Sequence, residues 1–145
     1  MPMVVLGGTF NVFHRGHAKL LDDAMTAASF RESSLVIGIT SDSFAQSSRN
    51  VPVRPYSERL RDVREYVESS DLRPYFGPVV YETVGSKDDM PAMRENDVLV
   101  VSEETAPNAY RVLAQKDYDC TVHVIDMVHD SEGRELHSTR ILEGN

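Results

Sequence analysis

Short segments that are apolar at nearly every position alternate along this chain with segments whose apolar residues recur at helical spacing. The pattern predicts strands at residues 3–7, 34–40, 78–84, 97–102 and 121–128, and helices at 15–29, 56–70 and 103–116. Continuously apolar strands joined by helices form parallel sheets that are covered on both faces. We therefore expect residues 1–145 to form one α/β domain, a Rossmann-like α/β/α sandwich around a parallel sheet of about five strands.

Charge and composition exclude several classes of protein. The chain has 145 residues, 41% of them hydrophobic, and a net charge of −8, which argues against broad nucleic-acid binding. No apolar run approaches the roughly 20 residues of a membrane span, and the N-terminus lacks the basic region of a signal peptide. The single cysteine, Cys120, has no partner within the chain. We expect a cytoplasmic protein without a membrane or nucleic-acid partner, and its oligomeric state stays open.

The turn after the first predicted strand reads "GGTFNVFHRGH", from Gly7 to His17. Ligands of parallel α/β sheets bind beyond the carboxyl ends of the strands, so this turn lies where a ligand is expected. It contains neither the G-x-G-x-x-G dinucleotide fingerprint nor the Gly-Lys-Ser/Thr of a P-loop. What remains is His14, Gly16 and His17 at the start of a helix, where the helix dipole and backbone N–H groups favour an anion.

Three interpretations of this turn remain open from the residues alone. It is a phosphate site, in which the imidazoles and Thr9 add donors and Gly8 and Gly16 let the ligand approach the backbone. Alternatively, Gly8 only makes a turn and the histidines cap the helix. A metal site is the third interpretation, although neither a cysteine nor a suitably spaced carboxylate accompanies His14 and His17.

Two motifs in this order resemble the nucleotidyltransferase superfamily. "GTFNVFHRGH" is similar to its G-T-F-D-x-x-H-x-G-H signature, and "HSTRI", His137 to Ile141, to its I-S-S-T-R-I motif. Within the superfamily the chain most resembles the archaeal-type phosphopantetheine adenylyltransferases. The similar blocks are "IGITSDSFAQ", "VRPYSERLRDVREYV", "VLVVSEETAPNAYRV" and "DSEGRELHSTRILEG".

Five positions depart from that family's pattern. Asn11 stands where the family has Asp, Leu113 replaces an Asn, and Lys116 replaces an Arg. His137 and Leu142 flank the second motif where the family has Ser and Arg. These departures bear on nucleotide affinity and on the substrate more than on the fold.

The resemblance implies transfer of AMP from ATP to 4′-phosphopantetheine, giving dephospho-coenzyme A and pyrophosphate. A phosphate monoester is already a nucleophile, so catalysis reduces to positioning and charge stabilisation. Mg²⁺ is expected to accompany ATP, held by phosphates and water without a protein ligand. The alternatives are the same chemistry with nicotinamide mononucleotide, flavin mononucleotide or another phosphorylated small molecule as acceptor, and a nucleotide-binding protein with impaired catalysis.

The resemblance also assigns residues to roles. Catalysis falls to His17 at the α-phosphate, His14 at the β- and γ-phosphates, and Arg140. The nucleotide-binding residues are Gly8, Thr9, Phe10, His14, Gly16, His17, Glu104, Ser138, Thr139 and Arg140. The acceptor-binding residues are Thr9, Arg49 and Arg54, although the two arginines are equally compatible with solvated loop positions, and Glu104 with a helix cap. The helix at 56–70 is expected to have Ser57 as its N-cap.

Overall fold

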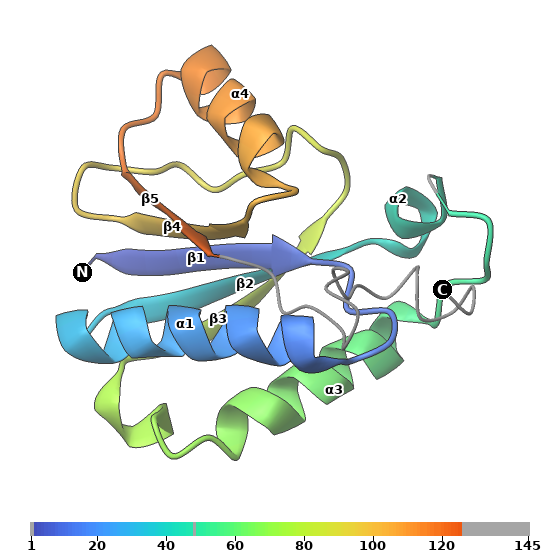
Figure 1. Cartoon of the computed structure of the whole chain (residues 1–145), viewed down its shortest axis with the longest axis horizontal. Helices are drawn as coiled ribbons and strands as arrows, with labels where there is room; N and C mark the ends of the chain where they lie inside the picture. The colour runs from blue at the N-terminus through green and yellow to red at the C-terminus, as the bar shows by residue number, and fades with distance from the viewer. Residues whose placement is uncertain (1, 48, 126–145) are drawn as a thin grey trace, which may run out of the picture.

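The computed structural model describes residues 2–47 and 49–125, and within them five strands form one sheet (Figure 1). The strands are β1 (Met3–Gly8), β2 (Ser34–Thr40), β3 (Val79–Val84), β4 (Val98–Ser102) and β5 (Thr121–Ile125). They lie in the order β3-β2-β1-β4-β5, and every neighbouring pair is parallel. The predicted parallel α/β fold is confirmed. The part of the last predicted strand beyond Ile125 lies outside the described residues.

Helices cover both faces of this sheet. They are α1 (Arg15–Arg31), the short α2 (Asp42–Ser47), α3 (Tyr56–Glu68), the 3₁₀ turn η1 (Arg73–Tyr75) and α4 (Ala106–Lys116). Figure 1 shows α1 and α3 on one face and α4 on the other. The prediction of Ser57 as N-cap is wrong: Pro55 occupies that position without a side-chain cap, because the chain is already helical from Tyr56.

The larger core lies under α1 and α3. The buried residues Leu21, Ala24, Met25 and Ala28 follow the i, i+3, i+4, i+7 spacing of one helix face. They pack against the side chains of β1, β2 and β4 that point to this side, together with Val63 and Val67 of α3. The core therefore fixes α1 against the strand that precedes it.

A smaller core lies under α4. It comprises Val5, Val36, Met93, Leu99, Val101, Ala106, Ala109 and Leu113. Leu113, one of the departures from the family pattern, is thus a core residue and only 8% exposed. Two methionines of the loop between β3 and β4, Met90 and Met93, complete this layer.

Strand β1 lies at the point where the order of the strands reverses. From β1 the chain continues outward to β2 and β3, then crosses back to add β4 and β5 on the other side. The loops after β1 and β4 therefore diverge at the carboxyl ends of these strands, which is where open α/β sheets bind ligands. Within the described residues, no helix is long and apolar enough to cross a membrane.

Candidate functional site

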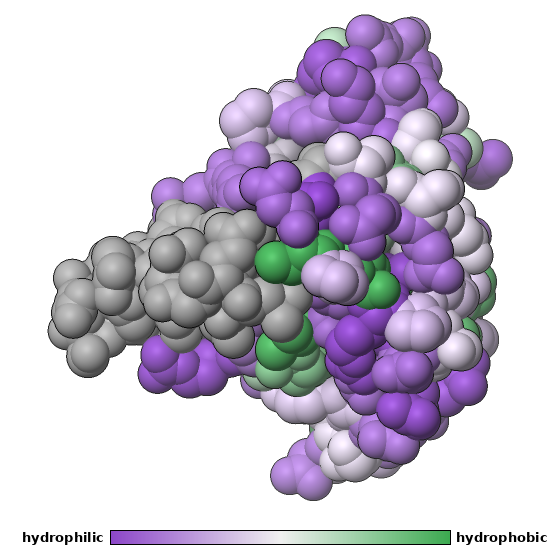
Figure 2. All heavy atoms as spheres, turned by 90° about the vertical axis from the view of Figure 1, so that its right-hand side faces the viewer, coloured by the Kyte–Doolittle hydropathy of each residue, from purple (hydrophilic) through white to green (hydrophobic). Residues whose placement is uncertain are grey.

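A cavity of about 480 Å³ opens at the carboxyl ends of β1, β2, β3 and β4. Its lining includes eight residues that the sequence singles out: Gly8, Thr9, Phe10, His14, Gly16, His17, Arg49 and Glu104. Viewed from this end, apolar side chains gather beside the grey segment, within a mostly polar surface (Figure 2). The structure thus brings together residues that are about 100 positions apart in the chain.

His14 and His17 cap the N-terminus of α1 reciprocally. Nδ1 of His14 accepts the N–H of Gly16 at 3.0 Å, and Nδ1 of His17 accepts the N–H of His14 at 3.3 Å. The two rings stack with their centroids 3.9 Å apart. The interpretation of the histidines as helix caps is therefore confirmed, and it does not exclude their use in ligand binding.

The cap also determines which imidazole nitrogen carries a proton. Because Nδ1 of both rings accepts a backbone N–H, each neutral ring bears its proton on Nε2. Nε2 lies on the other side of the ring from the cap, and Nε2 of His14 is itself buried; both histidines are among the residues that line the cavity. The capped helix start thus carries two imidazole N–H groups, a kind of donor that suits phosphate oxygens.

Phe10 makes the opening turn unusually tight. Its φ is +53°, in the left-handed region that a bulky residue rarely adopts, and its ring is fully buried. A Cβ at position 8 would lie 3.1 Å from that ring, so Gly8 leaves the space that Phe10 fills. The ring of Phe10 also packs against His17, with the centroids 5.1 Å apart. Gly8 and Phe10 thus help to fix the catalytic candidate His17.

Arg49 is a half-buried cation at the edge of the cavity. Nη1 donates to the carbonyl of Ala45 at 2.9 Å, while the buried Nε has no hydrogen-bond partner among the described residues. Burial and, next, the nearby charge of Arg59 lower the pKa of Arg49, and Glu104 partly opposes this shift. An anion bound beside Arg49 would favour its charged form and oppose both of these effects.

Arg54 is not brought into the cavity. Its guanidinium donates to Asp62 at 2.8 Å and to the carbonyl of Asn11 at 2.9 Å, and it pairs with Glu58 at 3.5 Å. Hydrogen bonding to Asp62 is the main reason that the pKa of Arg54 is raised. Of the two arginines proposed for the acceptor, only Arg49 lines the cavity.

Asn11, which stands where the family has Asp, forms hydrogen bonds with Arg54. Its side-chain oxygen accepts the backbone N–H of Arg54 at 2.8 Å, and the residue is fully buried. Its Nδ2 has no hydrogen-bond partner among the described residues. Asn11 therefore supplies the acceptor oxygen that an aspartate would supply, and it fastens the opening turn to the segment before α3.

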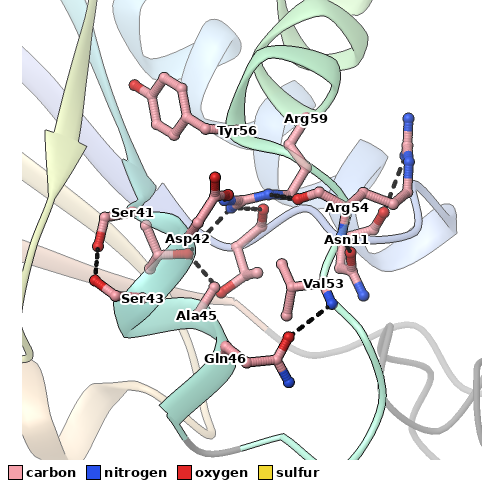
Figure 3. A network of polar contacts seen from close by, with 12 residues as sticks. Asn11, Ser41, Asp42, Ser43, Ala45, Gln46, Val53, Arg54, Tyr56 and Arg59 are labelled. Atoms are coloured by element: carbon pink, nitrogen blue, oxygen red, sulfur yellow. Dashed lines mark hydrogen bonds and ion pairs between the residues drawn. The ribbon is translucent and has the colours of Figure 1, made fainter.

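Sequence reasoning missed Arg59, a fully buried cation behind the opening turn. Figure 3 shows its side chain extending from α3 towards Asp42 and the loop that carries Arg54. It donates to Asp42 at 2.7 Å, to the carbonyl of Arg54 at 2.8 Å and to the carbonyl of Thr9 at 3.0 Å. The signal was present in the sequence, because Arg59, Val63 and Val67 share one i, i+4, i+8 stripe that is otherwise apolar.

The opposite side of the cavity comes from the loop after β3 and the start of α4. Nδ2 of Asn108 donates to the carbonyl of Lys87 at 3.0 Å, and Arg111 pairs with Asp88 at 2.7 Å. These contacts fasten the loop to α4. Glu104 lines the cavity but is not the N-cap of α4, which is Thr105.

The second motif of the sequence lies beyond the residues that the structure describes. Ser138, Thr139 and Arg140, like His137 and Leu142, lie outside the described residues. Within the part of the chain that the structure describes, no three or more His, Cys, Asp or Glu residues group together as they would to hold a metal ion.

Comparisons with known proteins identify the family of this chain. A family model described as cytidylyltransferase-like matches residues 5–144. A phosphopantetheine adenylyltransferase of Pyrobaculum aerophilum is 36% identical over 159 residues, covering 97% of this chain and 91% of the relative. The same-named protein of Methanopyrus kandleri is 37% identical over 146 residues, covering 95% and 87%. A crystal structure from Archaeoglobus fulgidus, described as a protein with unknown function, has a TM-score of 0.66 at 28% identity and covers 86% of this chain and 98% of that one.

The parallel sheet with its cavity at the strand reversal defines an α/β protein of the Rossmann-like class, in which ligands bind at such a reversal. With the matches to the family model and to these relatives, the chain belongs to the cytidylyltransferase-like family of nucleotidyltransferases.

Proposed function

We propose that this chain is an adenylyltransferase that transfers AMP from ATP to 4′-phosphopantetheine. The observation that carries the proposal is the pair of capped histidines, which line one cavity together with Thr9 and Arg49. Relatives that cover nearly the whole chain are named phosphopantetheine adenylyltransferases. This supports ATP as the nucleotide and phosphopantetheine as the acceptor.

The reaction needs donors and cations more than it needs a base. An oxygen of the acceptor phosphate attacks the α-phosphorus of ATP, the bond from that phosphorus to the bridging oxygen breaks, and pyrophosphate leaves with the electron pair. Negative charge accumulates around the α-phosphate and on the leaving group during this displacement. Groups that are already oriented towards those oxygens lower the barrier, because they need no reorganisation.

The histidines are assigned to these oxygens. Nε2–H of His17 contacts the α-phosphate, and Nε2–H of His14 contacts the β- and γ-phosphates. The cap holds both rings in place before ATP arrives. Thr9 lies between the nucleotide and the acceptor phosphate, and Arg140 neutralises the leaving pyrophosphate. Mg²⁺ enters with ATP as part of the substrate, held by phosphates and water.

Arg49 is assigned to the phosphate of the acceptor. Its guanidinium is half-buried and close to a second cation, Arg59, so a dianionic phosphate bound beside it would offset the repulsion that helps to lower the pKa of Arg49. Glu104, at the start of α4, is assigned to the nucleoside. The apolar floor of the cavity, which includes Val36, Leu99 and Val101, suits the uncharged parts of both substrates.

Pyrophosphate release from ATP tests the proposal. The acceptors are 4′-phosphopantetheine, nicotinamide mononucleotide and flavin mononucleotide, each repeated with CTP in place of ATP. We expect release only with ATP and 4′-phosphopantetheine. Release with another pair would retain the chemistry and overturn the substrate, and binding of ATP without release would indicate a nucleotide-binding protein.

His17→Asn separates the two uses of that histidine. An Asn side chain can still accept the N–H of His14 in the cap, but it has no donor at the position of Nε2. We expect a loss of about 10²- to 10³-fold in kcat with little change in melting temperature. His123→Ala is the matched control, because His123 is exposed on β5 and does not line the cavity. Equal activity of His17→Asn and the wild type would exclude His17 from the transfer.

A further inference from the structure

Three side chains form a line of hydrogen bonds from α3 to the cavity. Nη1 of Arg59 donates to the hydroxyl of Thr40 at 3.2 Å, and that hydroxyl donates to the hydroxyl of Thr9 at 3.0 Å. Thr40 ends β2 and Thr9 follows β1, so the line crosses two adjacent strands at their carboxyl ends. Arg59 is fully buried, and both threonines line the cavity.

The direction of this line follows from its first member. A guanidinium has five N–H donors and no acceptor, so Thr40 Oγ1 must accept from Arg59. The Thr40 proton then goes to Thr9 Oγ1, the one acceptor that this hydroxyl has among the described residues. Since Thr9 Oγ1 accepts from Thr40, its own proton is directed away from Thr40. A hydroxyl that is otherwise free to donate or accept is thereby set as a donor.

Arg59 fixes the backbone at the same place. Its Nη1 also donates to the carbonyl of Thr9 at 3.0 Å. The Thr9 carbonyl and the Phe10 N–H belong to one planar trans peptide and point in opposite directions. Holding this carbonyl therefore turns the Phe10 N–H away from Arg59, at the residue whose φ is +53°.

We infer that Arg59 and Thr40 are positioning residues, which set the Thr9 hydroxyl as a hydrogen-bond donor to a phosphate oxygen of the bound nucleotide. This inference rests on the proposed function for the identity of the ligand. A phosphate oxygen in the transferred group can only accept, so a hydroxyl held as a donor needs no rotation when charge develops. Neither Arg59 nor Thr40 needs to touch the substrates to have this effect.

A double-mutant cycle tests the line, using Thr40→Val, Thr9→Val and the double variant. Val keeps the shape of Thr and removes the hydroxyl. We expect Thr40→Val to lower kcat about tenfold and to raise the Kd for ATP about threefold, because the Thr9 hydroxyl loses its fixed direction. In the Thr9→Val background the Thr40→Val change should have no further effect on either quantity, since no hydroxyl remains to be oriented.

Two further variants exclude a merely structural effect. Thr40→Ser keeps the hydroxyl and should restore kcat to within about twofold of the wild type. Thr121→Val makes the same replacement at an exposed strand position outside the cavity and should change nothing. Two results would overturn the inference. One is a Thr40→Val protein with wild-type kcat and Kd; the other is a double variant in which the separate effects of Thr40→Val and Thr9→Val multiply.

Measuring the Kd for ATP throughout the double-mutant cycle keeps this test separate from the test of the proposed function. If the wild type binds ATP but transfers AMP to no acceptor, the proposed function fails, and the coupling between Thr9 and Thr40 in ATP binding still decides the inference. If ATP itself does not bind, both fail.

Discussion

Two ion pairs of equal length lie on opposite sides of the cavity, and they differ in how deeply the arginine is buried. Arg59 and Asp42 are 2.7 Å apart, and so are Arg111 and Asp88. The carboxylates are similarly exposed, at 62% for Asp42 and 55% for Asp88, but the Arg59 side chain is 0% exposed and that of Arg111 is 36% exposed. Arg59 also donates to two carbonyls and a hydroxyl. We call the side formed by residues 8–17, 40–47 and 49–59 the buried wall, and the side formed by residues 82–91 and 104–109 the exposed wall.

The comparison shows that the N···O distance alone does not determine how much an ion pair contributes to stability. An exposed pair contributes little, because water competes for both partners. A buried guanidinium is different, because its loss leaves carbonyls without a donor inside the protein. The buried wall contains the described residues assigned to the reacting phosphates, and the exposed wall forms the opposite side of the cavity. We therefore expect the buried wall to be the more rigid of the two.

The largest effect is expected from Arg59→Ala. This change leaves the carbonyls of Thr9 and Arg54 without their buried donor, and it empties the volume of a large side chain. We expect a loss of at least about 3 kcal/mol in the free energy of unfolding, measured by urea denaturation. Arg61→Ala, an exposed position on the same helix, is the control and should change stability by less than about 0.5 kcal/mol. Similar values for the two variants would remove the distinction between the walls.

An intermediate effect is expected from Gly38→Ala, a change on β2 at a position that lines the cavity. A Cβ at this position would lie 2.7 Å from Cγ2 of Val84, on the neighbouring strand β3. We expect a loss of about 1–3 kcal/mol from overpacking, together with weaker ATP binding because Gly38 and Val84 both line the cavity. Gly85→Ala is the matched control, because its nearest neighbour would be an ordinary 3.4 Å away. An unchanged Gly38→Ala protein would show that the sheet adjusts here at no cost.

A smaller effect is expected from Arg111→Gln. The variant loses the ion pair with Asp88 but keeps a polar side chain that water can solvate. We expect the melting temperature to change by less than about 2 °C. A larger drop would mean that the exposed wall depends on its ion pair as strongly as the buried wall depends on Arg59.

The smallest effect concerns acidification. Hydrogen bonding to Arg111 is the main reason that the pKa of Asp88 lies below its ordinary 3.8. A lowered carboxyl pKa stabilises the fold above 3.8, and this contribution disappears as the pH falls through the pKa of the folded protein. The difference in stability between the wild type and Arg111→Gln should therefore be constant from pH 7 to about pH 5 and vanish only below pH 3.8. A difference that vanishes near neutral pH would contradict this assignment.

The sequence predicted the sheet better than the polar connections behind it. Strand β2 begins and ends as expected, at Ser34 and Thr40, because a continuous apolar run between polar residues is unambiguous. The opening turn was also located, since its glycines and histidines follow a strand. Ser57 failed as a cap because Pro55 lets the helix start earlier, which residue preferences do not distinguish.

The roles of Arg54 and Arg59 could not be read from the sequence in the same way. An arginine in a loop near a predicted phosphate site suggests a ligand contact, but Arg54 instead binds Asn11 and Asp62, partners 43 and 8 positions away. Arg59 occupies an apolar stripe, and only the fold shows that Thr9, Thr40 and Asp42 surround it. Long-range pairing of polar groups depends on how strands are ordered, which no local pattern contains.

The reversal of strand order at β1 has a thermodynamic consequence. A ligand in the cavity contacts loops that follow strands on both sides of β1, so it joins segments that are distant in the chain. Binding to the folded state alone would add about 2.7 kcal/mol of stability at a ligand concentration of 100 times Kd. The protein would then resist heat and proteolysis according to the supply of its own substrates, and a variant that has lost transfer but retains the cavity would keep that protection.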